Sequence, residues 1–221
     1  MTTLLAVTAH PDDECFLFGG ALALHARRGG RAGLLCLTDG QVGRAGGLVL
    51  QEELGPFRHE ELKRAVDVLG IPHLFTPGLS DGELQEMGDG EGAALVAEVA
   101  ADFGADLLLT FGPDGASGHA DHKACWRWTR AAASERRLYA ATFPPGMKDM
   151  PRGAEPLPVT TLLDISELGD LKSRAFAEHR TQQDHLERHQ WFMEQAQGRE
   201  WYHRVQPVWN NGDPLETSLT D

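Results

Sequence analysis

Residues 4–14 of the 221-residue chain read LLAVTAHPDDE, and this stretch decides the fold. The run Leu4 to Thr8 has the length and the apolar character of a strand that is buried on both faces. It ends in the polar turn His10-Pro11-Asp12-Asp13, after which residues 13–28 are predicted to form a helix that stops at Gly29-Gly30. A buried strand that leads through a polar loop into a helix is typical of an α/β unit.

The same alternation continues along the chain. Further strands are predicted at residues 33–38, 73–76, 106–111 and 159–165, and helices at residues 52–69, 92–103, 119–134, 167–179 and 184–197, before a polar tail. Near-continuous apolar strands between helices indicate a parallel sheet. We therefore expect an α/β fold, a Rossmann-like three-layer sandwich with a mostly parallel sheet and helices on both faces.

The chain is predicted to form a single domain over residues 1–221. Its core α/β unit is expected over about residues 1–145, and an added strand, helices and tail over about 146–221. A proline-rich loop at residues 144–158 joins the two parts. No repeat or low-complexity linker divides them.

The composition limits the classes of partner. The formal net charge of −13 argues against a protein that binds nucleic acid or an anionic membrane through a basic surface. No apolar run approaches the roughly 20 residues that span a bilayer, and the first residues lack the basic region of a signal peptide. The three cysteines are too few and too scattered for a disulfide framework. We expect a cytoplasmic protein that binds neither nucleic acid nor membranes and acts on a small molecule, while a homo-oligomer is left open.

Two of the polar loops that follow predicted strands carry an unusual set of side chains. The first holds His10 with Asp12 and Asp13, and the second holds His119-Ala120-Asp121-His122. In an open parallel sheet, ligands bind in the crevice outside the carboxyl ends of the strands. Two histidines and a carboxylate with an open fourth position are the ligand pattern of a catalytic zinc. Adjacent Asp12 and Asp13 point apart, so we expect one carboxylate at the metal and the other at the attacking water.

Simpler explanations exist for each motif taken alone. An Asp-Asp pair after a strand is typical of a helix N-cap, and an isolated HxDH is typical of an exposed helix start. The two motifs together, both at strand ends of one sheet, favour a site. The glycines of residues 112–118 depart from the G-x-G-x-x-G pattern of dinucleotide binding. His185 and His189 lie four residues apart beside charged neighbours, which predicts an exposed helix face rather than a metal pair.

The stretch Ala9-His10-Pro11-Asp12-Asp13-Glu14, followed by the HxDH of residues 119–122, resembles the PIG-L/LmbE family of zinc-dependent N-acetylglucosamine deacetylases. That family includes the deacetylases of mycothiol and bacillithiol biosynthesis. The similarity extends to residues 58–70 (RxxEL…A…LG), 81–84 (DGxL) and 172–182 (K…A…H.TQ), so it covers nearly the whole chain.

The resemblance implies a role for each residue of the two motifs. It implies three zinc ligands, His10, Asp13 and His122, with Asp12 as the general base. His119 would be the cationic partner that stabilises the oxyanion or protonates the leaving amine, and Asp121 would orient a neighbouring histidine. Zinc in such a site lowers the pKa of bound water to about 7 and polarises the amide carbonyl.

Three further residues are implied as substrate-binding groups. Arg58 and Asp81 stand where the family contacts sugar hydroxyls, and His179 matches a late family histidine. The expected reaction removes the N-acetyl group from an N-acetylglucosamine-type substrate, such as the conjugate precursor of a low-molecular-weight thiol. Two alternatives remain open: a metal-dependent hydrolase of another amide or ester, and a metal-supported sugar-binding module without chemistry. Fe²⁺ or Co²⁺ suits the same ligands as zinc, and the exact substrate is not determined.

Overall fold

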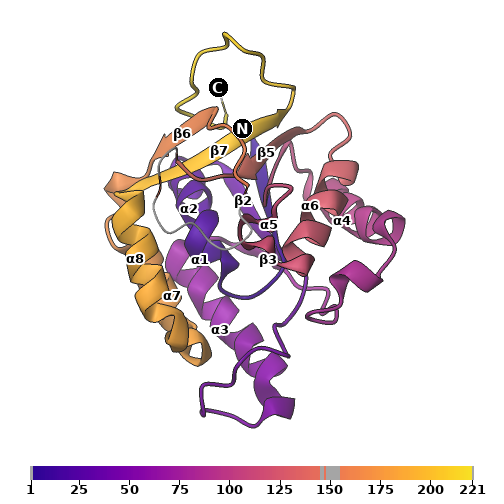
Figure 1. Ribbon diagram of the computed structural model, residues 1–221, viewed down its shortest axis with the longest axis vertical. Coiled ribbons are helices and arrows are strands. Elements are labelled where there is room, and N and C mark those ends of the chain that lie inside the picture. The colour runs from indigo at the N-terminus through magenta and orange to yellow at the C-terminus, as the bar shows by residue number, and fades with distance from the viewer. Residues whose placement is uncertain (1, 145–146, 148–154, 221) are drawn as a thin grey trace.

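The computed structural model describes residues 2–144, 147 and 155–220, and a seven-stranded sheet in the order β3-β2-β1-β4-β5-β7-β6 forms its centre (Figure 1). The strands are β1 (Thr3–Thr8), β2 (Arg31–Cys36), β3 (His73–Phe75), β4 (Leu107–Thr110), β5 (Arg137–Ala141), β6 (Thr161–Asp164) and β7 (Arg199–Gln206). Strands β1 to β5 pair in parallel, whereas β7 runs antiparallel to both β5 and β6. The predicted mostly parallel sheet is confirmed.

Helices cover both faces of this sheet, as predicted. They are α1 (Asp13–Leu17), α2 (Gly19–Arg27), α3 (Leu54–Leu69), α4 (Asp89–Phe103), α5 (Gly115–Gly118), α6 (Ala120–Ala132), α7 (Leu171–Glu178) and α8 (Leu186–Ala196), with short 3₁₀ turns at Gln51–Glu53, Leu84–Glu86, Ser166–Leu168 and Arg180–His185. Helices α1, α2, α3, α7 and α8 lie on one side, and α4 to α6 lie on the other (Figure 1). None of the described helices combines the length and apolar character that a bilayer crossing needs.

The position of β1 explains where a site can form. The side chains from Leu4 to Val7 are fully buried, because helices pack on both faces of this central strand. Its neighbours are β2 on one side and β4 on the other. The chain leaves β1 toward α1 on one face and leaves β4 toward α6 on the opposite face. Such a change of direction opens a crevice at the carboxyl ends of the two strands.

The first predicted helix is interrupted. Residues 13–28 form two helices, α1 and α2, because Phe18 between them leaves the helical conformation at φ −128°. The Phe18 ring is fully buried and meets Phe111 edge to face at 5.4 Å between ring centroids. Aromatic packing against the loop after β4 therefore takes precedence over helix continuity.

The end of the chain differs most from the sequence prediction. A polar tail was expected after residue 197, but residues 199–206 form β7, which fills the gap between β5 and β6. Its buried Glu200 accepts hydrogen bonds from the backbone N–H groups of Gly20 and Ala21 at 2.9 and 2.8 Å, and from Lys172 Nζ at 2.6 Å. The sequence REWYHRVQ of β7 is mostly polar and therefore has no strand pattern. The groups that make its burial possible lie far away in the sequence. Strand β5 was also not predicted, and much of the predicted 144–158 loop lies outside the described residues.

The prediction of an exposed helix face at His185 and His189 is wrong for His189. Its side chain is fully buried, because α8 packs on α7 and α1. The His189 ring stacks on Phe176 at 4.2 Å and meets Phe16 edge to face at 5.0 Å. Burial, reinforced by the charge of Lys172, lowers the pKa of His189 to about 4.

This buried histidine predicts a pH-dependent stability. In the unfolded chain the His189 ring takes up a proton below about pH 6.5, whereas in the folded protein it stays neutral down to about pH 4. Its contribution to stability is thus lost as the pH falls from 6.5 toward 4. We expect the stability of His189→Leu to fall less than that of the wild type between pH 8 and pH 5, measured by urea unfolding. Parallel losses in the two proteins would contradict a neutral buried ring.

The packing of α4 on α6 gives a second prediction, which concerns two glycines of one helix. A methyl group at Gly92 would lie 2.1 Å from the ring of Trp128. This ring is held in place because Trp128 Nε1 donates a hydrogen bond to Asp89 at 3.2 Å. At Gly90, in contrast, a methyl group would meet open space. Gly92→Ala should lower the free energy of unfolding by about 1–3 kcal/mol through overpacking. Gly90→Ala should leave it unchanged or raise it by up to about 1 kcal/mol. Equal stability of the two variants in urea would refute this close contact.

Candidate metal centre

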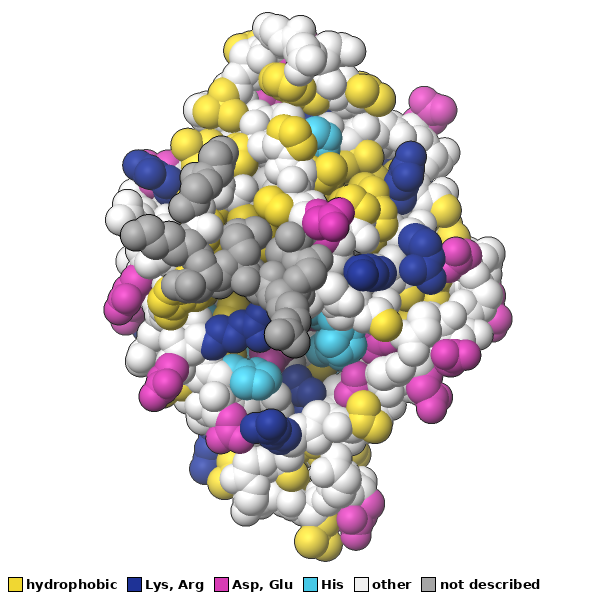
Figure 2. Space-filling model, viewed as in Figure 1, with side chains coloured by type: hydrophobic (Ala, Val, Ile, Leu, Met, Phe, Trp, Pro, Cys, Tyr) yellow, Lys and Arg dark blue, Asp and Glu magenta, His cyan; other side chains and the backbone are white. Residues whose placement is uncertain are grey.

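A cleft of about 460 Å³ opens at the carboxyl ends of β1 and β4. The loop after β1 contributes His10, Asp12 and Asp13 to its lining, and the loop after β4 contributes His119 and His122. The structure therefore brings together the two motifs that lie more than 100 residues apart in the sequence. Figure 2 shows histidine side chains and basic side chains, Lys or Arg, gathered around a hollow on this face.

Three side chains place donor atoms at nearly equal distances from one another. His10 Nδ1 lies 3.2 Å from His122 Nε2, Asp13 Oδ1 lies 3.3 Å from His122 Nε2, and Asp13 Oδ2 lies 3.7 Å from His10 Nδ1. Ligands at 2.0–2.1 Å from a tetrahedral zinc lie roughly 3.3–3.4 Å apart. The two histidine nitrogens thus have the spacing of two ligands of a tetrahedral zinc, and Asp13 brings one of its two oxygens within 3.7 Å of each nitrogen.

The far edge of the His10 ring faces two carboxylates. Its Nε2 lies 3.0 Å from Asp81 Oδ1 and 3.1 Å from Asp121 Oδ2. Burial alone would lower the pKa of His10, but Asp121, Asp81 and Asp13 outweigh it and raise the pKa to about 10. This arrangement holds a proton on Nε2 and directs Nδ1 toward Asp13 and His122, as in carboxylate–histidine–metal triads.

His122 is fixed in the complementary way. Its Nδ1 lies 2.9 Å from the carbonyl oxygen of Gly115, which makes this nitrogen the donor and leaves Nε2 with a free lone pair. The ring also stacks on Phe111 at 4.0 Å. Gly115 has a φ of +66°, and a side chain there would meet His122 Cβ at 2.9 Å, so this approach requires glycine.

Asp13 and Asp121 remain ionised although they are buried. Burial would raise the pKa of Asp13, but His122 and His10 hold it well below its usual range. Burial also opposes ionisation of Asp121, yet its hydrogen bond with His10 and the N–H groups of Gly82 and Leu84, at 2.7 and 3.1 Å, lower its pKa. Together with Asp12 and Asp81, four carboxylates surround His10, His119 and His122, and a dication would balance their charge.

His119 lies on the open side of the cluster. It caps α6, because its Nδ1 accepts a hydrogen bond from the backbone N–H of Asp121 at 3.2 Å. The neutral ring therefore carries its proton on Nε2. Burial and the nearby His10 and His122 lower the pKa of His119, which favours this neutral form. A ring nitrogen of His119 also lies within 4.8 Å of nitrogens of His10 and His122, so His119 borders the cluster.

Asp12 has a strained backbone that neighbouring groups hold in place. Its φ of +114° is rare for a residue with a side chain. Glu14 Oε2 accepts a hydrogen bond from the Asp12 N–H at 3.0 Å, and Arg58 Nη2 donates to the carbonyl oxygen of Pro11. Glu14 is itself held by His179, whose Nε2 lies 2.5 Å from Glu14 Oε1. The turn thus presents the Asp12 carboxylate to the cleft while Asp13 faces the histidines.

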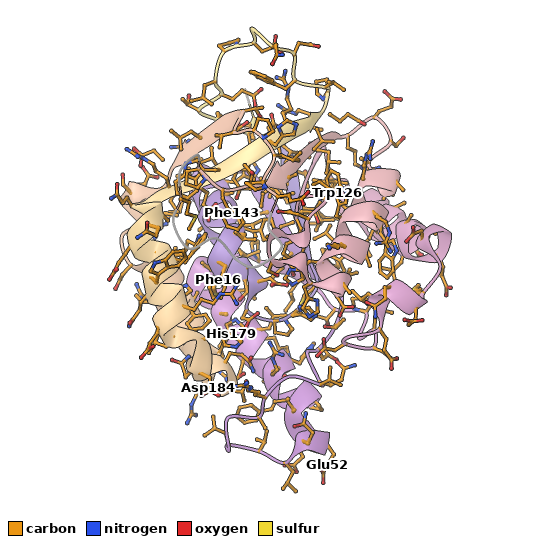
Figure 3. All side chains as sticks on the ribbon, viewed as in Figure 1. Phe16, Glu52, Trp126, Phe143, His179 and Asp184 are labelled. Carbon is orange, nitrogen blue, oxygen red and sulfur yellow. The ribbon has the colours of Figure 1, made fainter. Side chains whose placement is uncertain are left out.

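The three predicted substrate-binding residues occupy different positions. Asp81 and Arg58 line the cleft. Arg58 also donates to Gly40 and Pro11, and Gly40 must be glycine because a side chain there would overlap the guanidinium. His179, labelled in Figure 3, is fully buried against Glu14 and is not among the cleft-lining residues. A direct contact of His179 with substrate therefore has no support in the structure.

Sequence reasoning missed two residues. Glu14 belongs to the first motif but was given no role. Its position directly after two aspartates could have indicated that it supports the turn. His185 was predicted to lie on an exposed helix face, but it lines the cleft, and its Nδ1 lies 3.9 Å from Asp12 Oδ2. No sequence signal separates His185 from other surface histidines, because the position of the 3₁₀ turn Arg180–His185 in the fold determines where it lies.

The strain at Asp12 predicts an inverted order of stability for two substitutions. Asp12→Ala and Asp12→Gly both remove the carboxylate, but only alanine keeps a Cβ at φ +114°. The glycine variant should be more stable by about 1–2 kcal/mol, the reverse of the usual order. Thermal and urea unfolding of the two variants measure the difference. If alanine were equally stable, the left-handed turn would not be strained in solution.

The chain is similar to proteins of known family. The family described as "PIG-L: GlcNAc-PI de-N-acetylase" matches residues 5–133, more than half of the chain. A 1D-myo-inositol 2-acetamido-2-deoxy-alpha-D-glucopyranoside deacetylase of Corynebacterium glutamicum (strain R) is 31% identical over 156 residues, 61% of this chain and 54% of that protein. The chain thus spans about half the length of this curated relative. A probable N-acetyl-alpha-D-glucosaminyl L-malate deacetylase 2 of Bacillus subtilis (strain 168) is 32% identical over 192 residues, 81% of this chain and 82% of that protein.

The fold is also shared by a protein with a different activity. The crystal structure of GalB, the 4-carboxy-2-hydroxymuconate hydratase of Pseudomonas putida KT2440, has a TM-score of 0.76 at 20% identity and covers 95% of this chain and 98% of that chain. Such a likeness concerns the fold alone, so the activity must be argued from the site. The match over residues 5–133 shows that the chain belongs to the PIG-L family.

Proposed function

We propose that this protein is a zinc-dependent N-deacetylase that releases acetate from an N-acetylglucosamine-type substrate. The observation that carries the proposal is the triangle of His10 Nδ1, Asp13 and His122 Nε2, with a second carboxylate, Asp12, beside it in the cleft. The family match and the deacetylase relatives support it.

His10, Asp13 and His122 would hold the metal. Both histidines have one ring nitrogen occupied by an oxygen partner, and the other faces the shared centre, which suits a metal rather than a hydrogen bond between two rings. The excess of carboxylates around them favours a divalent cation. When bound there, zinc supplies Lewis acidity, which makes a water molecule more acidic and polarises a carbonyl oxygen.

Asp12 acts as the general base in this proposal. Its carboxylate lines the cleft beside the cluster but is not one of the three converging donors. Arg58 Nη2 lies 3.7 Å from Asp12 Oδ2 and helps to hold the carboxylate in place. A carboxylate in this position can accept the proton of the attacking water as the oxygen approaches the amide carbon.

His119 stabilises the developing oxyanion. Because its Nδ1 is occupied by the N–H of Asp121, the neutral ring offers an Nε2–H donor without a full positive charge. This refines the sequence-based expectation of a cationic partner. The proton that Asp12 accepts is then available for the leaving nitrogen, so that the C–N bond breaks to give acetate and a free amine.

The separate roles of the two aspartates can be tested by substitution. Asp12→Asn should retain about one zinc per chain while turnover falls on the order of 10²–10⁴-fold, because only the proton acceptor is lost. Asp13→Asn should lose both zinc and activity. Metal content is measured by mass spectrometry, and acetate release is assayed on N-acetylglucosaminyl-malate, N-acetylglucosaminyl-inositol and free N-acetylglucosamine.

A matched control is Asp102→Asn, which removes an exposed carboxylate at the end of α4 and should retain both zinc and turnover. Full turnover of Asp12→Asn would refute the general-base role. Zinc loss in Asp12→Asn but not in Asp13→Asn would show that the two roles are exchanged. A zinc-loaded wild type that releases acetate neither from these three compounds nor from alkyl or aryl glycosides of N-acetylglucosamine would contradict the proposed substrate class.

A further inference from the structure

The cleft extends from the metal cluster along an apolar wall. This wall consists of five side chains, Phe16, Leu17, Phe143, Trp191 and Phe192. Phe16 and Leu17 come from the end of α1, Phe143 follows β5, and Trp191 and Phe192 come from α8. Figure 3 shows Phe16 and Phe143 beside α8. Three of these residues lie outside residues 5–133, so they do not belong to the part of the chain that the family match covers.

The apolar wall is anchored in the core. Phe192 lies 6.0 Å from Phe16 and 6.1 Å from Phe143 between ring centroids, and Phe16 meets the buried Phe176 edge to face at 5.5 Å. Phe143 and Phe192 are nearly buried, whereas Trp191 is partly exposed in the cleft. A fixed aromatic surface of this kind binds a flat or aliphatic group without having to rearrange first.

The cleft also has polar lining residues, among them Ser117, Gln182 and His185, and its arginines differ in their partners. Among the described lining residues there are three arginines. Arg58 is engaged by backbone carbonyl groups, and Arg44 is exposed and pairs with Asp184 at 3.7 Å. This leaves the exposed Arg188 as the one described lining arginine without a recorded partner. A polyol or a dicarboxylate would need several convergent polar partners, which the apolar wall does not provide.

We propose that the apolar wall is a subsite for the group attached to the amino sugar, and that this group is apolar, an aromatic ring or a short alkyl chain. The inference rests on the proposed function, because it takes the metal cluster as the place where the acetamide is cleaved. The cluster and the apolar wall line one continuous cleft, so a single substrate can reach both. The subsite makes the preferred substrate more apolar than an inositol or malate conjugate.

Glycosides that differ only in the attached group test this subsite. The zinc-loaded protein is assayed for acetate release from the methyl, hexyl and phenyl glycosides of N-acetylglucosamine, together with the inositol and malate conjugates. We expect kcat/KM for the hexyl and phenyl glycosides to exceed that for the methyl glycoside by about tenfold or more. Equal values for the three glycosides, or a preference of that size for the inositol or malate conjugate, would overturn the proposal.

Substitution of Trp191 identifies the surface responsible. Trp191→Ala should reduce the phenyl-to-methyl ratio of kcat/KM at least about fivefold, and Trp191→Phe should restore most of it, because a ring is again present. Trp209→Ala removes a tryptophan outside the cleft and should leave the ratio unchanged. An unchanged ratio in Trp191→Ala would contradict the assignment of this wall.

A binding measurement separates this inference from the proposed function. Calorimetric titration with the phenyl and methyl glycosides of glucosamine, the deacetylated products, needs no turnover. Tighter binding of the phenyl compound that Trp191→Ala abolishes supports the subsite, even if no acetate is released in the assay and the deacetylase proposal fails. Equal binding of the two glycosides would overturn the subsite, even in an active deacetylase.

Discussion

Buried negative charge at the carboxyl ends of β1 and β4 is the constraint on which the rest of the site depends. Asp12, Asp13, Asp81 and Asp121 are all at most 9% exposed, and uncompensated carboxylates in such a place would be very costly. Each has its own compensation in histidines, backbone N–H groups or Arg58. Because these partners come from five separate segments, the fold must be complete before the charges can coexist.

The need to compensate buried carboxylates also explains why many polar side chains around the cleft are held in one position. Asp121 joins the loop of residues 81–84 to His10, and Glu14 joins His179 to the backbone of Asp12. In both cases a carboxylate that is not among the cleft-lining residues holds a residue that is. Catalytic geometry depends on such supporting contacts, because small displacements of a base or a ligand reduce the rate strongly.

The elements that could be predicted from the sequence are those with a clear local pattern of apolar and polar residues. LLAVT and DLLLTF have an unmistakable strand character, and polar residues at their ends indicated which side chains would meet. Elements whose structure depends on distant partners were not predictable. Strand β7 has a polar sequence, and its Glu200 can be buried only because Lys172 and the first turn of α2 supply partners. The burial of His189 depends in the same way on the packing of α8 against Phe16 and Phe176. The role of Arg58 was also hidden, because its acceptors are backbone carbonyl groups that no sequence pattern marks.

The two parts of the chain contribute differently to the cleft. Residues 5–133, which match the family, carry all the donor atoms of the metal cluster as well as Asp12, His119 and Arg58. The later residues complete the sheet through β6 and β7 and add Phe143 and the side chains of α8 to the lining. A donor cluster tolerates little change, since ligand number and spacing are set by the metal, whereas an apolar wall can be rebuilt with other side chains of similar volume. Under the proposed roles, the chemistry and the choice of substrate can therefore change independently, because the donor cluster and the apolar wall lie on different elements of one cleft.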